Sequence, residues 1–175
     1  MKTPNLNKFL VTRSPEVAMF AESCGVEVIF VDLETVGKAD RQKNQGTPIN
    51  SHSVEDAAKI KKKLKHAQLL TRINPLYKGS RTEIESVIDA GSDIIMIPFF
   101  SHPDDLKPLL EIIDGRAKVS LLFETPLSIF RFNHFLDELK FDEVHFGLND
   151  LRILSGLDFL FETVSGGVLE SAISE

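Results

Sequence analysis

Acidic side chains stand directly after two of the short apolar runs in this sequence. Glu124 follows the run that ends at Phe123, and Asp150 lies four residues beyond Phe146. Carboxylates that share a poorly solvated place repel each other, and a hard divalent cation with oxygen ligands relieves that repulsion. Magnesium commonly takes one or two carboxylates and fills its remaining positions with water and substrate oxygens. Glu124 and Asp150 are therefore the candidate metal ligands, and they leave room for an oxo acid to chelate the ion.

An arginine and further polar residues end the other runs. Arg72 could hold a substrate carboxylate as a two-pronged fork. Gly147 permits a close backbone approach, and Asn149 could cap a helix or contact a ligand. The residues expected at these run ends are Asp32, Glu34, Arg72, Asn74, Pro98, Glu124, Gly147, Asn149 and Asp150.

Several of these residues also have a purely structural interpretation. An acid after a strand often caps the next helix, so Asp32, Glu34 or Asp150 taken alone could equally be a cap or an ion-pair partner. Arg72 could be the structural partner of Glu34 or Glu124. Their recurrence at consecutive run ends favours a site.

The histidines and the single cysteine form no recognisable catalytic pattern. The sequence has no zinc-ligand spacing, no Ser-His-Asp arrangement and no glycine-rich phosphate loop. His145 is expected to pack inside the sheet, and Cys24 to be a core residue. Four further histidines fall in predicted loops or helices, where solvated or capping roles are more common: His52, His66, His102 and His134.

Short β-branched and aromatic runs alternate with helix signals along the chain. Ser14, Pro15 and Glu16 supply the cap, the first-turn proline and the acid of a helix start, and Gly25 ends that helix. The expected strands are 9–11, 26–31, 69–73, 93–98, 119–123 and 143–146. The expected helices are 15–23, 52–66, 81–90, 103–113, 128–139 and a region from 151 onward, with a long polar loop over 37–53. This alternation predicts a parallel α/β sheet whose strand ends gather the polar residues at one rim.

The predicted fold is a TIM-type (β/α) barrel of about six βα units, in one domain over residues 1–175. A closed barrel needs eight units and usually about 250 residues. Three explanations stay open: the last two units are missing from the sequence, the sheet stays open, or another chain completes it. Because an open edge exposes unpaired backbone and apolar surface, we expect a homo-oligomer.

Composition excludes several classes of partner. The chain has 20 Lys and Arg against 26 Asp and Glu residues, a formal charge of −6, which disfavours a nucleic-acid partner. One cysteine cannot form an internal disulfide, and the first residues lack the features of a signal peptide. The apolar runs are far shorter than the roughly 20 residues that cross a bilayer. We therefore expect a cytoplasmic protein with a small-molecule substrate and no membrane partner.

Five segments at successive strand ends carry a family resemblance: FVDLE at 30–34, TRIN at 71–74, AGSDIIMIP at 90–98, LFET at 122–125 and FGLNDL at 146–151. In order and spacing they resemble the motifs of the pyruvate-aldolase and citrate lyase β-chain family, the HpcH/HpaI type of the phosphoenolpyruvate/pyruvate barrel superfamily. The resemblance covers almost the whole chain.

This resemblance implies a carbon–carbon lyase or aldolase that binds Mg²⁺ or Mn²⁺ through Glu124 and Asp150. Arg72 would hold the carboxylate of a pyruvate- or oxaloacetate-like 2-oxo acid, or of a related acyl compound. The implied reaction passes through a metal-stabilised enolate. Asp32 and Glu34 match the acidic motif of the second strand, where they would order metal-bound water or Arg72.

The sequence departs from the family pattern after Glu34. The pyruvate aldolases have a histidine there that helps to move the proton, and this chain has Thr35. The acid of the citrate lyase branch is also absent, and Lys38, Arg41 and Gln42 in this region could meet a larger or more anionic substrate. The alternative function is a catalytically impaired barrel that binds an anionic metabolite as a scaffold or sensor. A phosphate-ester isomerase is less favoured, because phosphate sites usually follow strands seven and eight.

Overall fold

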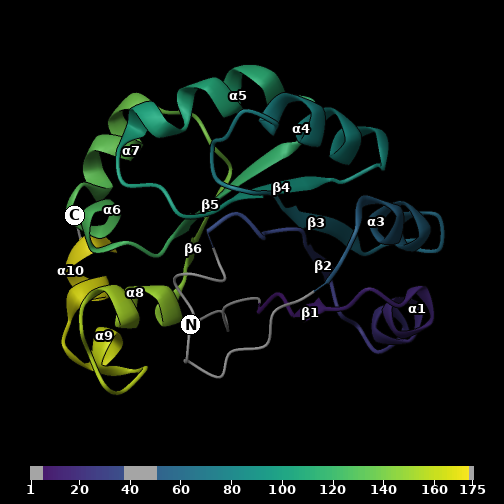
Figure 1. Cartoon of the computed structure of the whole chain (residues 1–175). Helices are drawn as coiled ribbons and strands as arrows, with labels where there is room; N and C mark the ends of the chain where they lie inside the picture. Colours follow the sequence, from purple (N-terminus) through teal and green to yellow (C-terminus); the bar gives the residue numbers. More distant parts are fainter. Residues whose placement is uncertain (1–5, 38–50, 174–175) are drawn as a thin grey trace.

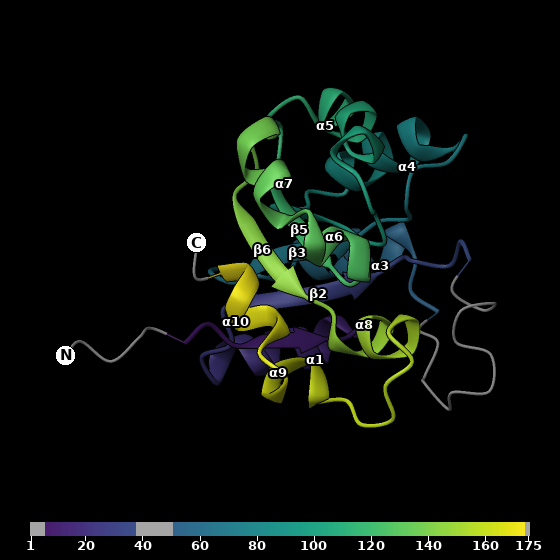
Figure 2. The ribbon, with the colours of Figure 1, turned by 90° about the vertical axis from the view of Figure 1, so that its left-hand side faces the viewer.

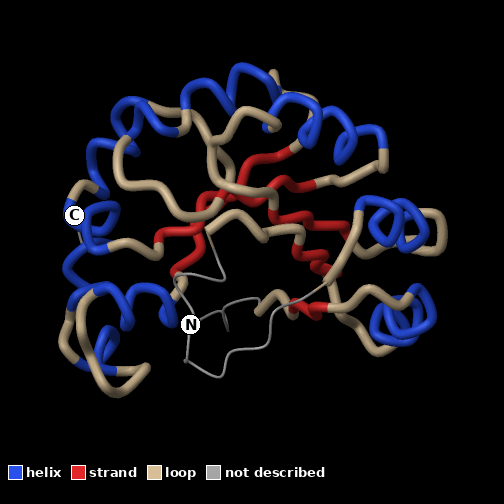
Figure 3. The backbone as a smooth tube through the Cα atoms, viewed as in Figure 1, coloured by secondary structure: helices blue, strands red, loops and turns tan. Residues whose placement is uncertain are grey.

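The computed structural model describes residues 6–37 and 51–173, and within them six parallel strands form one sheet. The strands lie side by side in chain order, β1 to β6, and each pairs with the next. They are β1 Phe9–Val11, β2 Val28–Asp32, β3 Gln68–Arg72, β4 Ile94–Ile97, β5 Lys118–Phe123 and β6 Glu143–Phe146. The sheet curls into an arc that is open between β1 and β6 (Figures 1 and 3). The predicted six-unit barrel is thus confirmed as a curled half-barrel.

Helices follow the strands and cover the outer side of the arc (Figure 1). They are α1 Pro15–Ser23, α3 Val54–Lys61, α4 Ser80–Asp89, α5 Lys107–Ile113 after the 3-10 turn η1 Pro103–Asp105, α6 Pro126–Phe130, α7 Phe132–Glu138, α8 Leu148–Leu154, α9 Glu162–Ser165 and α10 Val168–Ile173. Figure 2 shows the arrow of β6 ending beside α8. In the described segments, none of the helices has the length and apolarity that a bilayer span requires.

Both faces of the sheet carry buried apolar side chains, which explains why the strands appear as nearly continuous apolar runs in the sequence. Alternate residues such as Leu69 and Leu121 pack outward against the helices. Their neighbours Leu70 and Leu122 belong to a separate inner cluster. Because side chains alternate along a strand, the inner face is continued at the strand ends by polar residues, as by Arg72 after Leu70.

An aromatic cluster holds β5 against the helices beside it. The Phe123 ring lies 4.9–5.2 Å, between centroids, from the rings of Phe100, Phe132 and Phe135. Phe100 comes from the loop after β4 and is 3% exposed. The cluster therefore anchors that loop next to the carboxyl end of β5.

The helix predicted over 52–66 ends early, at Lys61, and the reason is tertiary. The Glu22 carboxylate accepts the backbone N–H groups of Lys65, His66 and Ala67 at 2.7–2.9 Å, which holds this segment as a connector. Lys61, the last residue of α3, forms a 2.6 Å ion pair with Asp93, which stands directly before β4.

Two other helix predictions and one burial prediction are wrong. The helix expected over 128–139 is divided at Arg131, whose guanidinium donates to the Ser101 carbonyl at 2.8 Å. The helical region expected from 151 begins at Leu148, directly after Gly147. Cys24 is exposed, because it caps α1 beyond the buried stripe of that helix.

The open edge at β1 is partly apolar. Phe9 and Val11 are 40% and 46% exposed. Homo-oligomer formation stays a prediction, and the β1 edge is the surface at which a second copy of the chain would pair.

Candidate active site

Four acidic residues are buried at the carboxyl ends of β2, β5 and β6. Asp32 ends β2 and Glu124 follows β5, while Glu34 and Asp150 lie just beyond β2 and β6. All four are between 2% and 5% exposed. Buried carboxylates are costly unless cations or hydrogen-bond donors compensate them, so their partners decide what the rim can do.

Arg72 compensates the two acids of β2. Its Nε and Nη2 donate to the two carboxylate oxygens of Asp32, both at 2.8 Å, and its Nη1 lies 3.4 Å from Glu34 Oε2. Its guanidinium carbon lies 5.6 Å from the centre of the Phe30 ring. Burial acts to lower the pKa of Arg72, but the hydrogen bonds and charge of Asp32, with the charges of Glu34 and Glu124, raise it.

The ion-pair interpretation of Asp32, Glu34 and Arg72 is therefore what the structure shows. The fork formed by Nε and Nη2 is already occupied by Asp32. A substrate carboxylate at Arg72 would have to use the remaining N–H groups, and this contact stays a prediction.

Glu124 has a strongly raised pKa. Burial, and then the charge of Glu34, raise the pKa of Glu124 to about 8; Arg72 opposes this rise and Asp150 adds to it. The Phe99 N–H donates to Glu124 Oε1 at 3.0 Å, and Phe99 has a φ of 51°, a conformation uncommon for a residue with a side chain. The backbone of the loop after β4 is therefore strained at Phe99, the residue whose N–H donates to the Glu124 carboxylate.

The Glu124–Asp150 pair fits the predicted cation. Both carboxylates are buried and the charge of Asp150 disfavours ionisation of Glu124, which is the repulsion that a divalent ion relieves. In residues 6–37 and 51–173 no group of three or more His, Cys, Asp or Glu side chains could hold a metal ion. A cation at this pair would take its other oxygens from water or substrate.

Gly147 makes room for Glu124. A Cβ atom at position 147 would lie 2.6 Å from Glu124 Oε2 and 2.7 Å from Glu124 Cβ. These separations are far inside van der Waals contact, so only glycine leaves the carboxylate where it is.

We expect Gly147→Ala to move Glu124 and to weaken Mg²⁺ binding, at a cost in folding stability of about 1–3 kcal/mol from overpacking. The Mg²⁺ dependence of the melting temperature and urea unfolding measure the two effects. Gly115→Ala is the control for Mg²⁺ binding, because a methyl group there meets nothing within 4 Å; its φ of 67° means that alanine costs stability there too, without touching Glu124. Unchanged Mg²⁺ affinity in Gly147→Ala would contradict the placement of Glu124.

Asn74 anchors the chain that follows Glu34. Its Oδ1 accepts the N–H groups of Thr35 and Val36, both at 2.8 Å, and its Nδ2 donates to Glu83 at 2.7 Å. Burial raises the pKa of Glu83, although the hydrogen bonds from Asn74 oppose that rise. A ligand contact by Asn74 stays a prediction. Glu83 could not be recognised from the sequence, because an acid in a first helical turn ordinarily faces solvent.

His52 reaches the rim from far along the chain. Its Nδ1 accepts the backbone N–H of Asp32 at 3.0 Å, so the expectation of a solvated or capping histidine is wrong. Beside it, Arg13 Nη1 donates to the carbonyl and hydroxyl oxygens of Ser51 at 3.2 and 3.1 Å. Sequence reasoning missed Arg13, since nothing in the spacing links β1 to residue 51. Lys38, Arg41 and Gln42 lie outside the described residues.

The remaining predicted residues are placed as follows. Pro98 follows β4, where its ligand contact stays a prediction. Asn149 lies within α8, and because Gly147 holds the cap position, the cap prediction for Asn149 is wrong; its ligand role stays a prediction. His145 lies on edge strand β6 with its ring 5.2 Å from that of Phe9, and its side chain is 27% exposed, so the prediction of a packed histidine holds only in part.

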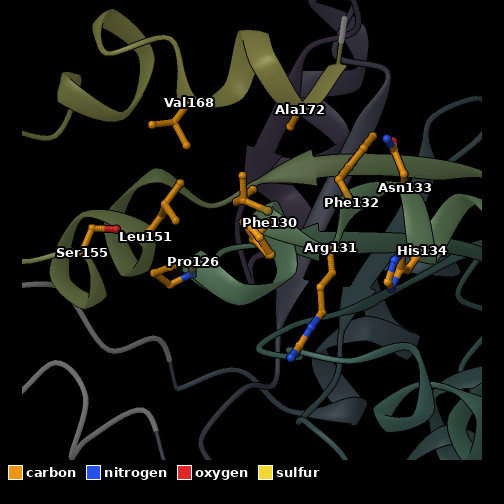
Figure 4. Close-up of a pocket in the computed structure, with 11 residues that line it drawn as sticks. Pro126, Phe130, Arg131, Phe132, Asn133, His134, Leu151, Ser155, Val168 and Ala172 are labelled. Atoms are coloured by element: carbon orange, nitrogen blue, oxygen red, sulfur yellow. The ribbon is translucent and has the colours of Figure 1, made fainter. Parts of the chain in front are cut away.

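A cavity of about 560 Å³ lies between helices α6–α7 and helices α8–α10. Phe130, Leu151 and Val168 project toward it (Figure 4). Its lining includes none of the predicted site residues.

Models of protein families and curated proteins give no match to this chain. Solved structures match along nearly all of it. An HpcH/HpaI aldolase from Desulfitobacterium hafniense DCB-2 is 14% identical over 95% of this chain and 71% of its own, with a TM-score of 0.72. An HpcH/HpaI aldolase/citrate lyase family protein from Burkholderia cenocepacia J2315 is 13% identical over 96% and 74%, with a TM-score of 0.74.

This chain has the fold of the HpcH/HpaI aldolase/citrate lyase proteins. The citrate synthase SbnG matches in the same way, at 15% identity over 96% of this chain and 71% of its own, with a TM-score of 0.70. At these identities the likeness concerns the fold, and at that level it confirms the resemblance seen in the strand-end motifs.

Proposed function

We propose that this protein is a metal-dependent carbon–carbon lyase or aldolase acting on a pyruvate- or oxaloacetate-like 2-oxo acid or a related acyl compound. The observation that carries the proposal is the buried Glu124–Asp150 pair, next to the Arg72 cation on the rim of a half-barrel. Structural neighbours with the same fold include aldolases, which supports a lyase-type activity.

Glu124 and Asp150 would hold Mg²⁺ or Mn²⁺. The cation, when bound, supplies positive charge to an oxygen on which negative charge develops. The Phe99 N–H fixes the orientation of Glu124, and Asp32 fixes that of Arg72. The two rigid supports preorganise the site, because neither side chain must reorient when substrate arrives.

His52 is placed to hold a proton at the rim. Since its Nδ1 accepts the Asp32 N–H, the neutral ring carries its proton on Nε2. In this form the imidazole is a hydrogen-bond donor and orients Asp32 through the backbone.

The metal site is tested by melting curves with Mg²⁺ or Mn²⁺. Either ion should raise the melting temperature of the wild type by mass action, and Glu124→Gln with Asp150→Asn should abolish that rise. The matched control is Asp104→Asn with Glu138→Gln, which removes two exposed acids beside Lys107. In this control the metal ion should still raise the melting temperature. No effect of metal on the wild type would overturn the assignment.

Pyruvate release distinguishes an active lyase or aldolase from a catalytically impaired barrel that binds an anionic metabolite as a scaffold or sensor. Incubation with Mg²⁺ and oxaloacetate or a 4-hydroxy-2-oxo acid should release pyruvate. Thr35, whose N–H is held by Asn74 where the aldolases have a histidine, favours the scaffold or sensor alternative. Tight binding without pyruvate release would support that second function.

A further inference from the structure

The rim carries a second arginine, Arg13, at the end of β1. The Thr12 N–H donates to the Phe30 carbonyl at 3.1 Å, which continues the pairing of β1 with β2 beyond Val11. Phe9 faces the inside of the arc, where its ring meets His145 of β6. Because side chains alternate along a strand, Val11 follows Phe9 on the inner side, and Arg13 comes two residues after the strand, where its guanidinium reaches Ser51.

A short series of contacts connects Arg13 to the proposed site. Arg13 holds Ser51, the next residue His52 accepts the Asp32 N–H, and the Asp32 carboxylate holds Arg72. Two strand spacings separate β1 from β3, so the chain positions that carry the two arginines are on the order of 10 Å apart. Long arginine side chains that start from positions this close can both reach one small molecule with an anionic group at each end.

The two arginines differ in their electrostatic state. The positive charge of Arg72 is offset by Asp32 and Glu34. In the part of the chain that the structure describes, Arg13 contacts Ser51 through Nη1 and pairs with no carboxylate. It therefore keeps its full positive charge and its Nε and Nη2 donors beside a rim that is otherwise rich in acids.

We propose that Arg13 binds the second, distal carboxylate of the substrate, so that the site prefers a 2-oxo dicarboxylate to a 2-oxo monocarboxylate. This inference rests on the proposed function and narrows its substrate class. An arginine fork suits a carboxylate, since two parallel N–H groups match its two oxygens. Ser51 holds one end of the fork in place and so reduces the entropy lost on binding.

The test compares 2-oxoglutarate with 2-oxopentanoate by calorimetric titration of the full chain with Mg²⁺. These ligands share a five-carbon 2-oxo acid skeleton and differ only at the distal carboxylate. The wild type should bind 2-oxoglutarate about 10- to 100-fold more tightly. Arg13→Gln should lose this preference and keep its affinity for 2-oxopentanoate, and Arg13→Lys should retain part of the preference.

Arg116→Gln is the matched control. It removes one exposed arginine before β5, at the opposite end of the sheet, and should keep the wild-type preference. Equal affinities in the wild type, or an unchanged preference in Arg13→Gln, would overturn this inference alone. Absence of binding by both ligands would overturn the proposed function and this inference with it.

Discussion

Glu124→Gln should stabilise the metal-free protein at pH 8, by up to about 4 kcal/mol, and change its stability little below pH 5. The cause is the burial of the carboxyl group, which raises its pKa from an ordinary 4.5 to about 8. Urea unfolding of wild type and variant at pH 4.5, 6 and 8, without metal, measures the difference.

The sign follows from the two protonation states. With the folded pKa above the unfolded value, the contribution of Glu124 to stability is fully present below pH 4.5 and is lost as the pH rises to about 8. Glutamine keeps the acceptor for the Phe99 N–H and cannot ionise, so the variant escapes that loss.

The same substitution should reduce pyruvate release by about 100-fold or more, because it removes a charged ligand of the proposed metal ion. Glu138→Gln, at an exposed acid, should show neither effect. If wild type and Glu124→Gln lose stability in parallel between pH 5 and 8, Glu124 is not the buried acid described above.

Arg72→Met should destabilise the protein by about 3–5 kcal/mol at pH 7, because it leaves two buried carboxylates without their cation. Asp32 and Glu34 are each 2% exposed, so water cannot replace the guanidinium without local opening. The shift of the urea midpoint measures the loss, provided that the denaturant slope is unchanged.

Two further variants separate charge from packing at this triad. Arg72→Met combined with Asp32→Asn and Glu34→Gln should regain much of the lost stability, since neutral amides need no cation. Arg72→Lys keeps the charge and loses the two-pronged geometry seen with Asp32, so its loss should be smaller. A stable Arg72→Met protein would show that other groups compensate these acids.

The order of strands and helices could be predicted because the central strands of this sheet, β2 to β5, are largely buried on both faces. A strand buried on both faces needs apolar residues at every position, so it appears in the sequence as a continuous apolar run, as at Ile94–Ile97. The polar residues then stand at the ends of these runs. Helix boundaries were less predictable. The carboxylate of Glu22 holds the connector after α3, and Arg131, at the division between α6 and α7, reaches Ser101. Both contacts join distant parts of the chain.

The sequence by itself determined which chemical groups stand at the rim and on which strand each one lies. Only the tertiary structure decided which of them meet. Arg72 and Asp32 are 40 residues apart, and His52 lies 20 residues beyond the backbone N–H that it accepts. The register and curl of the parallel sheet set these lateral neighbours, and no local pattern in the chain records them. For that reason Glu124 and Asp150 could be named as candidate ligands from their positions alone, whereas the engagement of Arg72 by Asp32 and the place of Arg13 required the fold.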